Sequence, residues 1–384
     1  MNYKSILICL FFVVQSVFSI EVRHINPPNL GEGHIGKKII CYRPMREGFP
    51  NFSVENVNRK ILVHNYGHGG SGWSIAPGTV NYCLSLFSEQ YPNLDRQTPV
   101  AVIGGGCIGL FTAYQLLEEG FSNITLYASS FDDLTSHHAG GLLSMRAFGE
   151  NAELQKLSID LGCFSYTYYK KIAEGSNQEL VGGASILPTY FVDLEQSELE
   201  VFVGKVMQPA KEVILDFGTG VTRRMLAYDD SLFIDTGFMM ERLTAFLKEK
   251  IVLCQREIQD FSELEQPVVF NCTGIGSSEL NSDASLYPVQ GHLLMLKDQN
   301  PKDFAYMMIV DWDEGYTENN QPIKRSLDLF PKRLPGTSCH DIGVIGGTFI
   351  HDADETTPNE EEFDLLIQRA YDFFYSSECT NLSQ

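Results

Sequence analysis

The stretch VIGGGCIGL constrains this chain most, because it joins a glycine pattern to a strand and a helix in a fixed order. The continuous apolar run of PVAVIGGG (99–106) is typical of a buried parallel strand. Residues 108–119 are predicted to form a helix that Gly120 ends, and NITLYA (123–128) is predicted to form the next strand. Such a strand–helix–strand unit requires a parallel sheet with helices packed on it.

Three glycines of this stretch form the pattern GxGxxG: Gly104, Gly106 and Gly109. The first permits a tight turn, the second lets the backbone approach a pyrophosphate, and the third lets the helix pack closely on the strand. The positive end of the helix dipole then faces the phosphates. The alternative is a glycine-rich turn between packed elements, but the flanking strands favour dinucleotide binding.

The second strand of this unit ends on an unexpected residue. A carboxylate usually stands there and binds the adenosine ribose, but the sequence has Ser129, with Asp132 and Asp133 shortly after it. A serine hydroxyl still forms a hydrogen bond to a ribose, although a weaker one than a carboxylate forms. The loop alone therefore does not distinguish FAD from NAD.

The rest of the pattern predicts a two-part α/β fold. Strands alternate with helices at both ends of the chain and cluster in its middle. The predicted strands are SLFIDTG, IVLCQREI, PVVFNCTG, HLLMLK, SLDLF and DIGVIGGTF, and the predicted helices cover 78–89, 238–250 and 360–374. We therefore expect a Rossmann-type, doubly wound domain beside a domain built on a mixed or antiparallel sheet.

A second glycine-rich stretch, HNYGHGGSGW (64–73), precedes the first. His64 and His68 have the spacing of two metal ligands on one helix face, but the four glycines of the stretch disfavour a helix. No metal site is therefore predicted here, nor at His137 and His138.

Several short segments taken together closely resemble the D-amino-acid oxidase family of FAD-dependent oxidoreductases. They are RPMR (43–46), HNYGHGGSGW, TSHHAGGLL (135–143), LFIDTGFMMERL, VVFNCTGIGS and YPVQGHLLML. The resemblance covers most of residues 38–374. It implies that FAD is the cofactor and that a Rossmann-type FAD-binding domain lies beside a substrate-binding domain.

The order of these segments differs from that of the family. In the family the RPxR and HNYGHGG segments come last, whereas here they precede the GxGxxG loop. This order indicates a circular permutation, which requires neighbouring termini and an exposed loop for the new ends. The expected division is a permuted segment at 21–98, an FAD-binding domain at 99–180 and 231–280 together with 340–375 and 60–98, and a substrate-binding domain at 181–230 and 281–340.

The resemblance also implies which residues bind FAD. The loop at 64–73 would face the flavin, where its backbone amides would stabilise the reduced, anionic ring. The segment at 135–143 would lie along the pyrophosphate and flavin, and the strand ending in NCTG would meet the adenosine end. The implied cofactor-binding residues are Gly104, Gly106, Gly109, Ser129, Ser136, His137, Gly140, Gly141, Leu142, Ile258, Thr273, Gly274, Gly69, Gly70, Ser71, Gly72 and Trp73.

Three residues are candidates for the substrate side. Arg43 is expected to clamp a carboxylate through two charge-assisted hydrogen bonds; Arg46 is a weaker candidate, and a structural surface pair is the alternative for Arg43. Tyr316 matches the lid tyrosine of the family, and Asp328 stands at or next to the place of its strand tyrosine. No catalytic base is implied, because in the family hydride leaves the α-carbon directly.

The resemblance implies oxidation of a D-amino acid to an imino acid that hydrolyses to a keto acid, with O2 or another acceptor taking the electrons. Asp328 favours a basic substrate or binding of the amine, and it leaves a secondary amine, such as an N-methyl or imino acid, as an alternative. A further alternative is an exported flavoprotein without turnover, against which Arg43 argues.

The N-terminal MNYKSILICLFFVVQSVFS predicts a signal peptide over 1–20 and export to the periplasm or the outside. A short membrane anchor is the alternative, but the apolar run is too short to span a bilayer comfortably. Removal of Cys9 leaves eight cysteines, whose wide spacing favours buried thiols over disulfides. The net charge of −21 argues against nucleic acid as a partner; a homodimer remains open.

Overall fold

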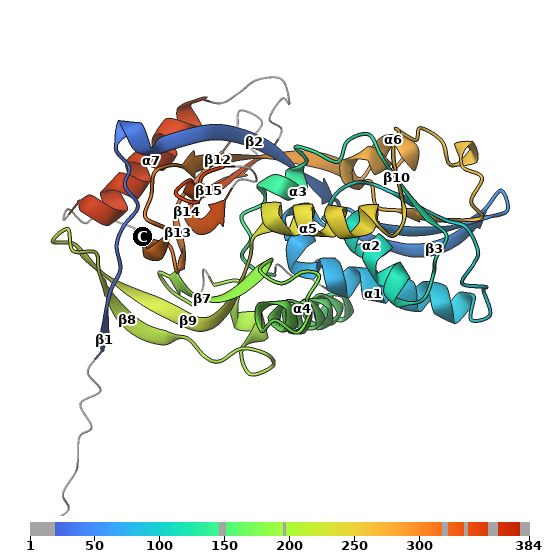
Figure 1. The fold of residues 1–384 in the computed structure, drawn as a ribbon. Coiled ribbons are helices and arrows are strands. Elements are labelled where there is room, and N and C mark those ends of the chain that lie inside the picture. Colours follow the sequence, from blue (N-terminus) through green and yellow to red (C-terminus); the bar gives the residue numbers. More distant parts are fainter. Residues whose placement is uncertain are drawn as a thin grey trace, which may run out of the picture.

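The computed structural model describes residues 20–145, 151–194, 197–316, 322–333, 337–351 and 360–376. Two β-sheets organise this part of the chain (Figure 1). The smaller sheet has six strands, in the order β10 (Val252–Gln255), β6 (Ile124–Ala128), β5 (Val100–Ile103), β11 (Val268–Asn271), β4 (Lys60–Tyr66) and β3 (Asn51–Val57).

The neighbours in the six-stranded sheet are parallel from β10 to β4, and only the edge strand β3 is antiparallel. Parallel strands end at one edge of the sheet, so the loops that follow them gather there. The loop after β4 contains HGG, and the loop after β5 contains GGG. The strand β11 alone separates these two loops.

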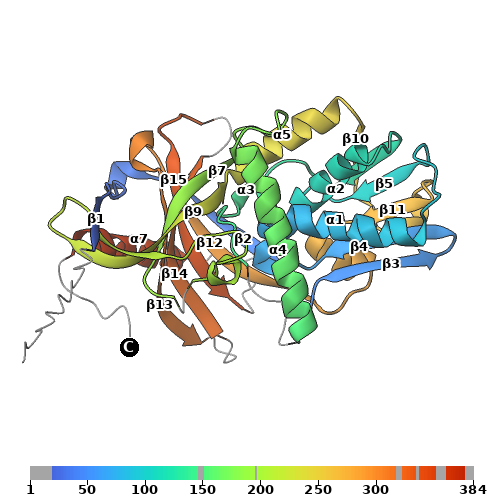
Figure 2. The same cartoon turned by 90° about the horizontal axis from the view of Figure 1, so that it is seen from below.

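Helices α1 (Gly72–Gln90), α2 (Cys107–Glu118) and α5 (Thr236–Lys248) form one layer on this sheet, and α4 (Ala152–Ala173) packs on α1 (Figures 1 and 2). Their apolar faces bury Phe87, Phe111 and Phe270. The opposite face of the sheet carries a smaller cluster that includes Leu62, Val269 and Ile258. Two short helices, α3 (Thr135–His138) and α6 (Ser277–Leu280), follow β6 and β11.

The first long helix begins earlier than the sequence predicts. The predicted span of 78–89 assumes that Pro77 opens the helix, but α1 begins at Gly72 and contains Pro77. A proline inside a helix leaves the carbonyl four residues earlier without its donor. Here the hydroxyl of Tyr169 on α4 donates to the Trp73 carbonyl at 2.8 Å and replaces the missing N–H.

The larger sheet has nine strands and is mainly antiparallel. Its order is β1 (Glu21–His24), β8 (Lys211–Asp216), β9 (Thr222–Ile234), β7 (Ala184–Phe191), β13 (Met307–Tyr316), β14 (Pro322–Arg333), β15 (Ile342–Ile350), β12 (Leu286–Leu296) and β2 (Ile35–Arg46). Helix α7 (Glu360–Tyr375) packs on β12, β14 and β15. The long strand β2 runs from this sheet toward the six-stranded one (Figure 1).

One expected boundary differs from the structure. Residues 340–375 were assigned to the FAD-binding part, but β15 pairs with β12 and β14 in the nine-stranded sheet, and α7 covers that sheet. The continuous apolar run of β15 suits a parallel strand, but it equally suits an antiparallel strand that is buried on both faces. The N-terminal segment contributes to both sheets, since β2 pairs with β12 and β4 pairs with β11.

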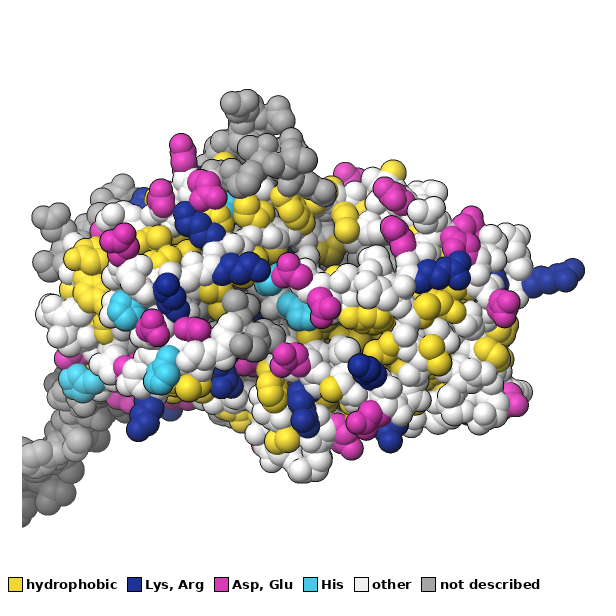
Figure 3. Space-filling view, turned by 45° about the horizontal axis from the view of Figure 1, so that its top comes forward, with side chains coloured by type: hydrophobic (Ala, Val, Ile, Leu, Met, Phe, Trp, Pro, Cys, Tyr) yellow, Lys and Arg dark blue, Asp and Glu magenta, His cyan; other side chains and the backbone are white. Residues whose placement is uncertain are grey.

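The described cysteines are free thiols, four of them buried: Cys41, Cys83, Cys107 and Cys272. Within the described ranges, no helix has the length and apolar character needed to cross a membrane. The predicted signal peptide lies outside the described residues, apart from Ile20. On the face shown in Figure 3, Lys and Arg side chains are scattered among acidic ones and form no continuous basic patch.

Candidate active site

A cavity of about 1040 Å³ lies where the two sheets meet, and both sheets line it. The six-stranded sheet contributes the loops at its carboxyl edge, and the nine-stranded sheet contributes β2, β12, β14 and β15. Loops at the carboxyl edge of a parallel sheet are the usual place for a dinucleotide. The size and the position of the cavity therefore suit a large cofactor together with a small substrate.

The loop after β5 consists of three glycines, so only backbone atoms face its surroundings. Gly104 has φ +122°, and a Cβ there would lie 2.3 Å from the Cys272 carbonyl oxygen. At Gly109 a Cβ would lie 1.9 Å from the Gly104 carbonyl oxygen, so only glycine lets α2 pack this closely on the strand. The predicted roles of the first and third glycines in the turn and in the packing are thus confirmed.

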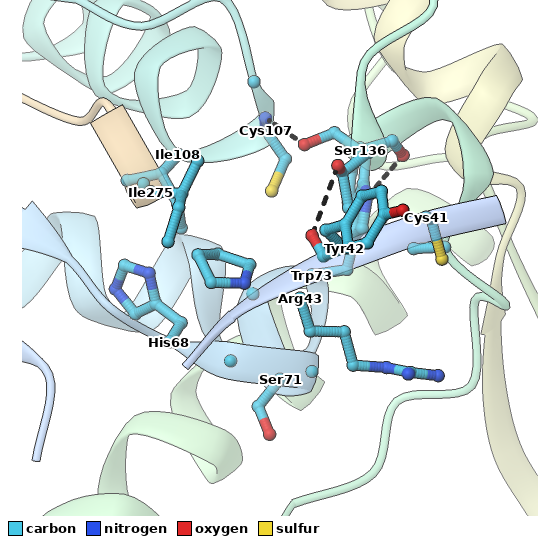
Figure 4. A pocket seen from close by; sticks show the side chains of 18 of the residues that line it. Cys41, Tyr42, Arg43, His68, Ser71, Trp73, Cys107, Ile108, Ser136 and Ile275 are labelled. Carbon is cyan, nitrogen blue, oxygen red and sulfur yellow. Dashed lines mark hydrogen bonds between the residues drawn. The ribbon is translucent and has the colours of Figure 1, made fainter. Parts of the chain in front are cut away.

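Ser136 connects the two helices that point at the cavity. Its hydroxyl accepts a hydrogen bond from the Cys107 N–H at 3.0 Å, at the start of α2, and its carbonyl accepts one from the Trp73 indole at 2.8 Å, at the start of α1 (Figure 4). Neither helix has a side chain from its own N-cap residue bonded to its first turn. Two positive helix ends therefore converge on one cavity, which suits an anionic ligand.

The loop at 137–141 is held from behind by a buried lysine. Lys332 is 1% exposed and donates to the carbonyls of His137 and Ala139, the latter at 2.8 Å, and to the Thr236 hydroxyl. Burial lowers the pKa of Lys332 to about 7, against the opposing effect of the Asp235 carboxylate. The nine-stranded sheet thus fixes a loop of the six-stranded part.

The loop after β11 is held by Asn271. Its Oδ1 accepts hydrogen bonds from the Thr273 hydroxyl at 2.8 Å and the Thr273 N–H at 3.3 Å. Its Nδ2 lies 3.2 Å from Nδ1 of His64, whose Nε2 lies 2.9 Å from Glu55. His64 therefore supports the neighbouring strand end and has a structural role.

The second histidine of HNYGHGG is also structural. The Nε2 atom of His68 forms a hydrogen bond with the side-chain amide oxygen of Asn65 at 2.8 Å. Burial lowers the pKa of His68 to about 3. It is therefore neutral in the folded protein. Among the described residues, no group of three or more His, Cys, Asp or Glu side chains has the arrangement of a metal site.

Most of the predicted cofactor residues line the cavity. They are Gly104, Gly106, Ser129, Ser136, Gly140, Gly141, Leu142, Ile258, Thr273, Gly274, Gly69, Gly70, Ser71, Gly72 and Trp73. Gly109 and His137 do not line it. Gly109 lies beneath the loop, and the His137 ring accepts from the Leu134 N–H at 3.1 Å, while its neighbour His138 lines the cavity. The sequence pattern did not indicate which of these two adjacent histidines lines the cavity.

Arg43 reaches the cavity from β2 across the neighbouring strand. Its Nη1 donates to the Thr348 carbonyl at 2.8 Å, and its Cζ lies 3.7 Å from the centre of the Phe349 ring. It crosses β12 at Gly291, where a Cβ would lie 2.5 Å from Nη1. The aliphatic part of Arg43 lies beside Gly70 of the predicted flavin loop. The guanidinium is therefore oriented by stacking and by a backbone carbonyl.

Arg46, the weaker candidate, also lines the cavity but has a different environment. Its Nε pairs with the Asp283 carboxylate at 2.8 Å, and its Nη1 donates to the Phe49 carbonyl. The Tyr66 hydroxyl donates to the same Asp283 oxygen at 2.9 Å. Arg46 therefore ties the end of β2 to β4 and to the segment after α6.

Asp328 belongs to a row of alternate residues on β14 that line the cavity: Lys324, Ser326, Asp328 and Phe330. Its Oδ1 accepts from the Ser326 hydroxyl at 2.7 Å. The pKa of Asp328 is raised to about 7, mainly by burial and also by the Asp311 and Glu198 carboxylates, while Ser326 and Arg43 act in the opposite direction. The strand period of two explains why these side chains share one face.

Tyr316 ends β13, where its backbone pairs with Pro322. Its side chain lies outside the described residues, so its assignment as the lid tyrosine stays a prediction. Phe330 and Ser326 line the cavity and were not predicted, although their spacing to Asp328 could have indicated them. Lys332, which holds the loop at 137–141, continues the same row on β14. No sequence pattern indicated that Gly291 and Phe349 contact Arg43, because both lie far from it in the sequence.

The cavity fits FAD on three observations. The GGG loop leaves no room for a Cβ, two helix N-termini point at the same space, and the cavity extends from Ser129 to Asp328. When bound, FAD would supply the electron acceptor for a two-electron oxidation. The backbone loops would hold its phosphates and ring, and Arg43 would stand on the substrate side.

Residues 99–216 match the family model described as FAD dependent oxidoreductase. A D-amino-acid oxidase of Streptomyces coelicolor is 27% identical over 282 residues, which are 72% of this chain and 77% of that protein. A D-amino-acid oxidase of Dictyostelium discoideum is 25% identical over 263 residues, 61% of this chain and 71% of that protein. The fold is similar to glycine oxidase from Bacillus cereus, with a TM-score of 0.51 at 16% identity over 71% of this chain and 77% of the other.

The matched region begins at the strand of the GxGxxG motif, and the likeness to the glycine oxidase structure is a likeness of fold. The mixed α/β architecture and the cofactor expected from the sequence are both confirmed. Residues 99–216 therefore match the FAD-dependent oxidoreductase family, and the chain is an FAD-dependent enzyme that is similar to amino-acid oxidases and dehydrogenases.

Proposed function

We propose that this enzyme oxidises a D-amino acid by hydride transfer from the α-carbon to FAD, giving an imino acid that hydrolyses to a keto acid. The observation that carries the proposal is Arg43, which lines the cavity and whose side chain passes beside Gly70 of the loop at 69–72. A guanidinium binds a carboxylate through two parallel hydrogen bonds. Two curated relatives named D-amino-acid oxidase support the same substrate class.

The residues of this chain contribute binding and orientation. Arg43 would hold the substrate carboxylate at a fixed place relative to the loop at 69–72, and positioning of this kind accounts for a large part of the rate enhancement. The backbone N–H groups at the start of α1 would stabilise negative charge that develops on the ring. The walls of the cavity, which include Phe330, Phe349 and Trp73, would exclude water from the reacting atoms.

A secondary amino acid is the second candidate substrate, since Asp328 lines the cavity and could bind a substituted amine. The test is anaerobic flavin reduction, followed by absorbance, with D-amino acids, their L-enantiomers and N-methyl amino acids. Reduction by D-amino acids supports the proposal. Reduction by N-methyl amino acids alone would favour the alternative, and a flavin that none of them reduces would favour a protein without turnover. Reoxidation by O2 would identify the acceptor.

We also propose that the chain is a circular permutation of the family order. Two contacts join the ends that the permutation would have separated: the Tyr375 hydroxyl donates to the Pro28 carbonyl at 2.8 Å, and Lys38 pairs with Glu360 at 2.9 Å. A rearranged chain that begins at residue 99, continues to 376 and is joined by a short linker to 27–98 should fold and bind FAD. Aggregation of this chain without bound flavin would contradict the proposal.

Export through a cleaved signal peptide remains our proposal for localisation. The first described strand begins at Glu21, directly after the predicted peptide, and its Arg23 pairs with Asp229 at 2.6 Å. Determination of the N-terminal residue of the mature protein tests this: a start near Ile20 supports cleavage, and an intact Met1 contradicts it.

Sedimentation of the FAD-loaded protein would decide whether it is a homodimer.

A further inference from the structure

The substrate half of the cavity has two charged ends whose separation follows from the sheet. The Arg43 guanidinium is bonded to the Thr348 carbonyl on β15, and Thr348 pairs with Arg325 on β14. Asp328 also lies on β14, but it pairs with Gly346, two residues farther along β15. One strand spacing of about 4.8 Å and two residues of about 3.3 Å each place the two backbone sites roughly 8 Å apart.

The two backbone sites therefore lie farther apart than the amino nitrogen and the carboxyl carbon of one α-amino acid. The fixed bond lengths and angles keep the amino nitrogen within about 2.5 Å of the carboxyl carbon. We infer from this backbone separation that a carboxylate held by Arg43 would leave Asp328 beyond the α-amine, where a substrate side chain can extend. A side chain of several methylene groups that ends in a cation can reach from one end to the other.

The surroundings of Asp328 favour a cation over a neutral group. Asp311 of β13 and Glu198, before the short helix at 200–202, face the same part of the cavity, and both disfavour a further negative charge there. Lys324 lines the same region, and Arg43 is the other cation that acts on Asp328. The Ser326 hydroxyl donates to Oδ1 of Asp328 at 2.7 Å and so orients the carboxylate.

We propose that Asp328 is a specificity-determining residue that binds the cationic end of a substrate side chain, so that the preferred substrate is an amino acid with an ammonium or guanidinium group at the end of its side chain. This inference rests on the proposed function, because it requires Arg43 to hold the carboxylate. Opposite charges in an enclosed cavity attract more strongly than at the surface, and an uncharged isostere would leave Asp328 without its partner.

The test compares matched pairs of D-amino acids that differ mainly in charge: D-arginine with D-citrulline, and D-lysine with D-norleucine. The FAD-loaded enzyme is mixed anaerobically with each at pH 8, and the ratio of rate constant to apparent dissociation constant is measured from flavin absorbance. We expect the cationic member of each pair to be favoured at least tenfold. In Asp328→Asn the preference should fall to less than threefold, whereas Asp328→Glu should retain it.

The control is Asp160→Asn, which removes an exposed carboxylate of α4 and should keep the wild-type ratio. Equal or better reduction by the neutral members in the wild-type enzyme overturns the inference and leaves the proposed function standing. An unchanged ratio in Asp328→Asn also overturns it. A flavin that no amino acid reduces overturns both, and because the wild-type comparison needs no variant, the inference can be tested even if Asp328→Asn loses its flavin.

Discussion

The two halves of the cavity are built in different ways. The cofactor half consists of backbone: Gly104, Gly70 and their neighbours lie in loops that directly follow parallel strands. The substrate half consists of charged and aromatic side chains on strands, such as Arg43 on β2 and Asp328 on β14. The residues of the cofactor half belong to short, contiguous sequence motifs. The substrate half depends on contacts between residues that are far apart in sequence, such as Arg43 and Thr348. Substitutions in the cofactor half should therefore reduce flavin binding, whereas substitutions in the substrate half should reduce turnover while the flavin stays bound.

The largest effect is expected from Gly109→Val, which breaks the cofactor half. The added side chain would overlap the Gly104 carbonyl, which is backbone and cannot move aside. We expect purified protein without bound flavin, measured by its visible absorbance, and loss of all activity. Gly33→Ala is the matched control, since a Cβ there meets nothing within 4 Å; an equal loss of flavin in that variant would contradict the explanation.

Arg43→Ala should break the substrate half while the flavin stays bound. Each charge-assisted hydrogen bond contributes about 1.5–3 kcal/mol, so the loss of two should lower kcat/KM by about a thousandfold. Arg43→Lys keeps the charge but not the paired geometry, and should recover only part of the rate. Steady-state kinetics with flavin content as control measure this. A variant with unchanged affinity for its substrate would exclude the clamp.

Arg46→Ala should affect stability more than substrate binding. The substitution removes the cation that pairs with the Asp283 carboxylate, and the side chain of Asp283 is only 9% exposed. A buried acceptor left without its partner costs about 1–3 kcal/mol, which thermal unfolding would detect as a lower Tm. Its apparent substrate affinity should change little. A large rise in KM with an unchanged Tm would reverse the roles assigned to the two arginines.

The smallest effect concerns pH. Burial raises the pKa of Asp328 to about 7, and Asp311, Glu198, Lys324 and Arg43 are the charged groups that face the same part of the cavity. Below this pH the carboxyl becomes neutral and attracts a cation less. The ratio of kcat/KM for D-arginine to that for D-citrulline should fall severalfold from pH 8 to pH 6, since kcat/KM reports groups of the free enzyme. A ratio independent of pH in this range would contradict the role of Asp328.

The same comparison explains what the sequence could predict. The GxGxxG turn and the strand–helix–strand unit are local, so their glycines and most of their boundaries agree with the structure. The start of α1 was wrong because a residue of α4, Tyr169, compensates for Pro77. The placement of 340–375 was wrong because an apolar run does not indicate which sheet it joins. Partners across a sheet are a tertiary property, and no local pattern encodes Gly291 beneath Arg43.

The position of β11 in the six-stranded sheet has a consequence for folding during synthesis. The strands β4 and β5 lie on either side of β11 and pair with it, not with each other. They leave the ribosome before β11, and although β3 and β6 pair with their other edges, the edges that face β11 stay open until residues 268–271 emerge. Unpaired strand edges promote aggregation, and distant pairings slow folding. The emerging chain must therefore keep β4 and β5 from pairing with each other or with other chains while about 165 further residues are made (from 103 to 268).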